Sequence, residues 1–98
     1  MKTLGDVRNV QRRFSQRLDE ALPMTALLLE ECSEQYVWYR DKVLAVLCAE
    51  LGMATDDPNS RLRNQSYDTP LGAQAQDAFN EWITWLMETD ENGGYASL

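Results

Sequence analysis

Apolar side chains recur every three or four residues along three stretches of this 98-residue chain, and that spacing restricts the fold more than any other feature. Residues at such steps lie on one face of an α-helix. The first stretch ends before Pro23, because proline disfavours helical geometry in the residue before it. The second stretch is the longest, and Gly52, just after it, suits a left-handed C-terminal cap. The pattern therefore predicts helices over about residues 6–21, 23–51 and 70–89.

The predicted helix starts are marked by residues that commonly cap helices. Asp6 is a candidate N-cap for the first helix, and Thr3 is the alternative for an earlier start. Thr69 and Pro70 suit the N-cap and first turn of the last helix, whereas Gly72 weakens that start. The central helix has a weak point near residue 33, so the spacing leaves its continuity there open.

No stretch alternates apolar and polar residues as a half-buried strand does, and no internal repeat is present. A chain of 98 residues with 44% hydrophobic residues builds one modest core. Leu47, in the middle of the apolar stripe of the central helix, is expected in that core. We therefore predict an all-α fold: a single domain over residues 1–98, built as a small three-helix bundle with a long central helix.

The segment before the last predicted helix, residues 53–69, is rich in turn-forming residues and poor in aliphatic ones. Its sequence Asp57-Pro58-Asn59-Ser60 is typical of a turn. A segment this long is more often functional or mobile than a plain connector, although a solvated linker with at most one short helical turn is the alternative. We predict a long irregular loop here and a loose tail over residues 90–98.

The residue types present exclude most catalytic chemistry. The chain has no histidine, which removes Ser–His–Asp triads, Cys–His dyads and imidazole acid–base catalysis. Carboxylates at residues 30–34 and 56–57 lack the partners or spacing of di-metal and calcium sites. Cys32 and Cys48 would lie about 24 Å apart on one straight helix, too far for a disulfide. We therefore predict a non-enzyme with no catalytic residues, no cofactor and no metal.

Charge is unevenly distributed along the chain, whose net charge is −7. Residues 1–18 carry five basic residues and one acidic residue, whereas residues 64–98 carry six acidic residues and no lysine or arginine. Most of the molecule would repel phosphate, so direct binding of nucleic acid is not expected. Arg8, Arg12 and Arg13 form a candidate basic edge on the first helix, unless they pair with acidic residues of the other helices.

Aromatic residues are the candidates for binding another protein. Trp38 and Trp85 lie off the main apolar stripes of their helices, so each is either packed in a small core or an exposed interface anchor. The Tyr67–Pro70 segment is expected to form an adaptable docking element with the acidic face of the last helix, ordered only on a partner. The candidate partner-binding residues are Tyr67, Pro70, Glu81, Trp85, Glu88 and Trp38.

These observations favour a small acidic protein-interaction module that binds a larger partner protein and inhibits or regulates it. One alternative is an acidic nucleic-acid mimic that blocks a nuclease, helicase or other DNA-handling defence enzyme, as small acidic proteins of phages and mobile elements do. A second alternative is a subunit of a homo-oligomer or larger assembly. The N-terminus does not resemble a signal peptide and no apolar run is long enough to span a bilayer, so we expect a cytoplasmic protein without a membrane partner.

Overall fold

The structure is a computed structural model that describes the backbone of residues 1–20 and 26–91 and the side chains of residues 1–13 and 34–88. The predicted first residue of the central helix, Pro23, and the last seven residues of the predicted tail lie outside the described residues.

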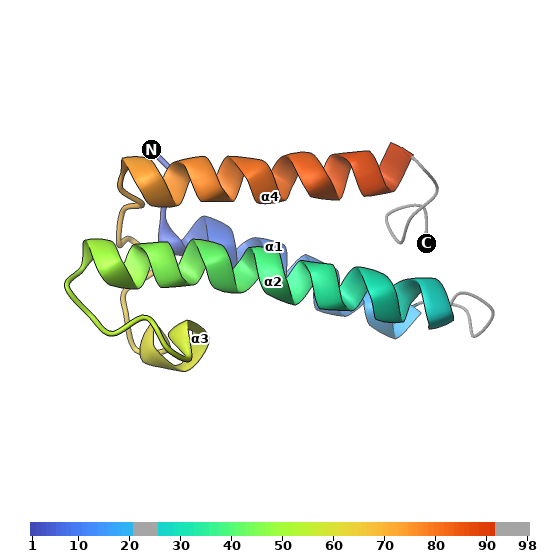
Figure 1. Cartoon of the computed structure of the whole chain (residues 1–98), viewed down its shortest axis with the longest axis horizontal. Helices are drawn as coiled ribbons and strands as arrows, with labels where there is room; N and C mark the ends of the chain where they lie inside the picture. Colours follow the sequence, from blue (N-terminus) through green and yellow to red (C-terminus); the bar gives the residue numbers. More distant parts are fainter. Residues whose placement is uncertain (21–25, 92–98) are drawn as a thin grey trace.

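Within the described part of the chain the structure contains helices and no strand, so the fold is all-α as predicted (Figure 1). It has one helix more than predicted, because a short helix forms inside the segment expected to be an irregular loop. The helices are α1 (Leu4–Glu20), α2 (Ala26–Glu50), α3 (Pro58–Arg61) and α4 (Ala73–Glu91).

Helix α2 is the longest of the described helices, and it continues without a break through residue 33. It runs antiparallel to α4, and this pair makes the most extensive contact between helices in the described residues (Figure 1). The short helix α3 packs against α2 near the end where α2 finishes. None of the helices described over residues 1–20 and 26–91 is long and apolar enough to cross a membrane.

The first helix begins two residues earlier than predicted, and Thr3 rather than Asp6 is its N-cap residue. The Asp6 carboxylate accepts hydrogen bonds from the Thr3 backbone N–H (2.8 Å) and the Thr3 hydroxyl (3.3 Å). This is the reverse arm of a capping box, in which an acidic side chain in the first turn bonds back to the N-cap residue. Asp6 therefore stabilises the helix start from inside the helix.

The backbone of residues 67–71 completes the start of α1. The N–H groups of Leu4 and Gly5 donate to the carbonyl oxygens of Thr69 (2.8 Å) and Tyr67 (2.9 Å). These N–H groups belong to the first turn of α1 and have no acceptor within the helix, so the loop supplies one to each. The loop exit is thus fixed against α1 in the free chain, which corrects the prediction that it becomes ordered only on a partner.

The same pairing explains why α4 begins at Ala73 rather than at Pro70. Thr3 and Pro70 form an antiparallel bridge, and the Leu71 N–H donates to the Lys2 carbonyl oxygen (2.9 Å). Residues held in this extended geometry cannot also form the first turn of a helix. The predicted N-cap role of Thr69 was therefore wrong.

The start of α4 is capped from a distance by Glu50, the last residue of α2. The Ala75 N–H donates to Glu50 Oε1 (2.6 Å). A Cβ atom on residue 72 would overlap the Glu50 carboxylate, so a larger residue there requires that carboxylate to move. Gly72 therefore permits the cap that α4 has, instead of merely weakening the helix start.

The predicted cap at the end of α2 is confirmed. Gly52 has a φ of 73°, in the left-handed region that glycine adopts without a steric penalty. The Met53 N–H donates to the Cys48 carbonyl oxygen (2.8 Å) and the Gly52 N–H to that of Ala49 (3.1 Å), the pair of bonds of a Schellman motif. Leu51, predicted to be the last helical position, follows the helix and is 42% exposed.

Residues 57–62 show why the predicted loop is not irregular throughout. Asp57 precedes α3 with a φ of 47°, and Pro58 is the first residue of the helix. Proline suits that position because its φ is already helical and its missing N–H would have had no partner there. Pro58 and Leu62 are both buried, so α3 closes one end of the core.

The core lies mainly between the C-terminal half of α2 and the N-terminal half of α4. Leu47 is fully buried there, as predicted. Among the side chains of residues 1–13 and 34–88, the buried hydrophobic ones are Leu4, Val7, Tyr36, Val43, Leu44, Leu47, Cys48, Leu62, Leu71, Ala75, Ala78, Phe79 and Trp82.

Candidate functional site

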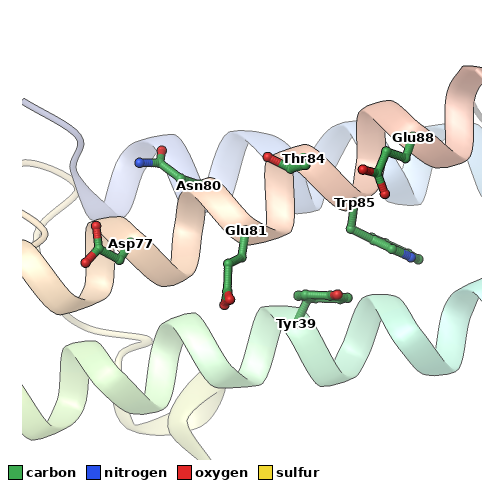
Figure 2. Close-up of a pocket in the computed structure, with 7 residues that line it drawn as sticks. All are labelled: Tyr39, Asp77, Asn80, Glu81, Thr84, Trp85 and Glu88. Atoms are coloured by element: carbon green, nitrogen blue, oxygen red, sulfur yellow. The ribbon is translucent and has the colours of Figure 1, made fainter.

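Three aromatic side chains form a continuous row across α2 and α4, which we call the aromatic row: Trp38, Tyr39 and Trp85. The rings of Trp38 and Tyr39 meet edge to face with centroids 4.9 Å apart, and Tyr39 stacks on Trp85 at 5.3 Å. Figure 2 shows Tyr39 of α2 and Trp85 of α4 pointing toward each other. Trp38 is 60% exposed, whereas the other two rings are partly buried against the core.

Polar contacts hold the aromatic row in place at both ends. The Trp85 indole N–H donates to Gln35 Oε1 on α2 (3.0 Å). At the other end the Lys42 ammonium lies 5.3 Å from the centre of the Trp38 ring and 2.8 Å from Glu81 Oε2 on α4. Rings fixed before binding lose little conformational entropy when a partner arrives, which favours affinity.

An open groove with acidic side chains runs beside the aromatic row along α4 (Figure 2). The carboxylates of Asp77, Glu81 and Glu88 line it together with Asn80 and Thr84. Residues 64–98 contain no lysine or arginine, so this side of α4 brings no positive charge of its own. Lys42 of α2 contributes the cation that meets it.

The aromatic row continues onto the outward face of α2. Val37 is 40% exposed next to Trp38, and a shallow hollow there is lined by Glu34, Val37, Trp38, Asp41 and Lys42. The exposed surface thus combines an apolar centre with charged side chains around it. This is the composition of a protein–protein interface, whose core is apolar and whose rim is polar.

The structure brings together four of the six predicted partner-binding residues. Trp38, Trp85, Glu81 and Glu88 all belong to the aromatic row or to the groove beside it. The two tryptophans differ in exposure: the Trp38 side chain is mostly exposed, whereas that of Trp85 is partly buried against the core.

The other two predicted residues, Tyr67 and Pro70, lie at the opposite end of α4. Their segment pairs with the start of α1, next to the first residue of α4, and Trp85 lies about 18 Å further along that helix. Tyr67 is 63% exposed, but it does not share a surface with the aromatic row. The sequence grouped Tyr67 and Pro70 with Trp85 because all three lie in or just before the last helix. Closeness in the sequence does not account for the length of helix that separates the loop exit from Trp85.

The predicted basic edge on α1 is reduced by one arginine. The Arg8 guanidinium donates to Asn59 Oδ1 (2.6 Å) and to the Asn59 carbonyl oxygen (3.3 Å), so it fastens α3 to α1. Its partial burial lowers the pKa of Arg8 from the ordinary value. Arg12 and Arg13 remain exposed. Among the described side chains, Arg8 therefore bonds to α3 and not to an acidic residue of another helix.

Sequence reasoning missed Tyr39, Gln35 and Lys42 as members of this surface. Tyr39 comes three residues after Tyr36 and four before Val43, a spacing that indicates the apolar stripe of the helix, and its stacking on Trp85 depends on how α2 and α4 align. A signal for Lys42 was present, since residues four apart on a helix are neighbours and Trp38 precedes Lys42 by four. That spacing puts a cation over an aromatic ring.

The thiol of Cys48 is buried in the core, and burial raises its pKa. In the described part of the chain, no group of three or more His, Cys, Asp or Glu side chains is arranged to hold a metal ion.

Comparisons of the chain with known protein families, with characterised proteins and with solved structures found no match.

Proposed function

We propose that the chain is a protein-interaction module that docks on a larger partner through the aromatic row and its acidic margin. The observation that carries this proposal is Trp38, which is 60% exposed and packs edge to face on the Tyr39 ring. Tryptophan is among the residues that contribute most to interface affinity, and burying it against a partner removes a large apolar area from water.

The proposed action on the partner is inhibition or regulation by covering part of its surface. In this proposal α1, α2 and α4 form a three-helix scaffold, and α2 and α4 present the aromatic row. The small size and acidic charge of the chain support an analogy with phage-type inhibitors of host enzymes. In this proposal the chain acts in the cytoplasm. That analogy concerns charge and size alone.

Docking through the aromatic row is better supported than mimicry of nucleic acid. The three groove carboxylates of α4 are spread over twelve residues, about 16 Å of helix, whereas double-stranded DNA carries one charge per ~1.7 Å. One of them, Glu81, is paired with Lys42 (2.8 Å). Charge this sparse supports a steering rim around an aromatic anchor more than a substitute for a phosphate backbone.

The test is to isolate a partner by affinity capture and then measure binding of the purified partner to matched variants. We expect Trp38→Ala to weaken binding at least about tenfold, the loss of an interface anchor. Tyr67→Ala is the control, since it removes an equally exposed aromatic ring at the other end of α4. We expect that variant to change affinity by less than about twofold.

Two results would refute the proposal. If Trp38→Ala binds as the unchanged chain does while Tyr67→Ala binds weakly, the docking surface lies at the loop exit. If binding collapses as salt rises and neither aromatic substitution matters, the chain acts by charge mimicry. Circular dichroism of each variant checks that the helices are intact.

A further inference from the structure

Lys42 holds a position on this surface that a partner's side chain can also take. Its ammonium lies 5.3 Å from the centre of the Trp38 ring and 2.8 Å from Glu81 Oε2, so one cation contacts an aromatic face and a carboxylate at once. The pair joins the hollow on α2 to the acidic groove on α4. Lys42 thus marks a two-point cation site between the two helices.

The contact that Lys42 makes is easily exchanged. The side chains of Lys42 and Glu81 are 41% and 57% exposed, and ion pairs this open to water contribute little to folding stability. The Lys42 side chain can therefore swing into solvent at small cost. When a partner covers the site and excludes water, the same aromatic face and carboxylate bind a cation more strongly.

The surroundings of the site favour a positively charged occupant with apolar neighbours. Asp77 lies one helical turn before Glu81 in the same groove, and α4 brings no basic residue to it. On the α2 side, Val37 is exposed beside Trp38. An occupant that matches both sides carries an arginine or lysine next to an apolar side chain, as a basic amphipathic helix does.

We propose that this surface receives a basic amphipathic helix of the partner protein, and that an arginine or lysine of that helix replaces Lys42 between Trp38 and Glu81. Arginine fits best, because its planar guanidinium stacks on an indole ring and bonds a carboxylate through two N–H groups. This inference rests on the proposed docking function, and it adds the chemistry of the partner and the side chain that the partner displaces.

The probe is an alanine-based helical peptide of about 18 residues with arginine and leucine on one face, long enough to be helical in isolation. The control peptide has the same composition with the arginines spread around the helix. The three tryptophan indole N–H signals report binding in nuclear magnetic resonance spectra of the full chain. We expect those of Trp38 and Trp85 to shift with the first peptide, whereas that of the fully buried Trp82 stays in place.

The deciding comparison uses Lys42→Ala and Arg63→Ala, which each remove one positive charge from exposed positions. If a partner cation replaces Lys42, removing that competitor tightens peptide binding at least about fivefold, whereas Arg63→Ala changes it less than about twofold. Equal effects of the two variants would show that only overall charge matters and would overturn the inference. Equal binding of the two peptides would overturn it as well.

Failure of this inference is distinguishable from failure of the docking proposal. A purified partner that needs Trp38 but is unaffected by Lys42→Ala, together with no peptide binding, refutes the basic-helix inference and leaves the docking surface standing. A partner that binds Trp38→Ala normally refutes the docking surface itself.

Discussion

Replacing Glu50 with alanine removes the side chain that caps α4, and its effect depends on what stands at position 72. The Glu50 carboxylate accepts a hydrogen bond from the Ala75 N–H (2.6 Å) and occupies the space where a Cβ of residue 72 would lie. Loss of a helix N-cap costs about 1 kcal/mol, within a range of about 0.5–2 kcal/mol. Glu50 is exposed, so its replacement removes the cap and little core packing. We therefore expect Glu50→Ala to lower the free energy of unfolding by about 1 kcal/mol.

Gly72→Ala is expected to destabilise the unchanged chain and to stabilise the Glu50→Ala variant. In the unchanged chain the new methyl group displaces the carboxylate and costs the same cap, about 1 kcal/mol. Gly72 does not have a positive φ, so alanine fits its backbone and gains about 0.5 kcal/mol by restricting the unfolded chain. In the Glu50→Ala variant there is no cap to lose, so only the gain remains. Gly72→Ala is thus expected to change the free energy of unfolding by about −0.5 kcal/mol in the unchanged chain and about +0.5 kcal/mol in Glu50→Ala, a coupling of about 1 kcal/mol.

Urea unfolding followed by circular dichroism measures the four free energies of this cycle, with slopes compared to confirm that the unfolded state is unchanged. Glu34→Ala is the control, since it removes an exposed acidic side chain of the same helix and is expected to change stability by less than about 0.5 kcal/mol. If Gly72→Ala has the same effect in both backgrounds within about 0.3 kcal/mol, Glu50 does not cap α4 and the reasoning is refuted.

Three further predictions follow from burial. Leu47→Ala is expected to lower the free energy of unfolding by about 2–5 kcal/mol, since Leu47 is fully buried, and a loss under about 1 kcal/mol in urea unfolding would contradict its place in the core. Burial raises the pKa of Tyr36 from 10.0 to about 12. Arg40 and Arg8 act in the opposite direction, and Asp41 adds a smaller increase. The unfolded chain therefore loses this proton at lower pH than the folded chain, and stability falls between about pH 10 and 12, more steeply than in Tyr36→Phe. In a Cys32→Ser variant, Cys48 is expected to react with a thiol reagent at least about tenfold faster in urea than in the folded chain, and equal rates would contradict its burial.

The three long helices were predictable because they follow from spacing along the chain, and Thr3 was one of two predicted caps for the first of them, whereas the start of α4 was not predicted. The Gly52 cap uses residues next to one another, so the sequence contains the whole motif. The starts of α1 and α4 depend on residues 2–5 pairing with residues 67–71 and on Glu50 reaching the α4 N-terminus. No local pattern contains such contacts. The short helix α3 agrees with the one short helical turn that the sequence left open as an alternative for this segment, but its position was not predicted, since Pro58 after Asp57 was interpreted as a turn although it also suits a helix start.

The candidate site was partly predictable for the same physical reason. Trp38 and Trp85 lie off the apolar stripes of their helices, and that position identified both as candidates for exposure. Their presence in one row depends on the alignment of α2 against α4, which places Tyr39 between them. The alignment is a property of packing between two helices, and a single sequence does not specify it.

A buried aromatic pair lies between α2 and α4 beside the aromatic row. The rings of Tyr36 and Trp82 meet in the core at 5.4 Å, and Tyr39 and Trp85, three residues later on each helix, meet at the surface at 5.3 Å. Residues three apart on a helix lie on nearly the same face, so the partly buried stack of Tyr39 on Trp85 continues the Tyr36–Trp82 contact toward the surface. In the described residues, α1 and α3 contribute Leu4, Val7, Pro58 and Leu62 to the other end of the core. The aromatic row therefore depends on the packing of α2 against α4, to which the Tyr36–Trp82 contact belongs.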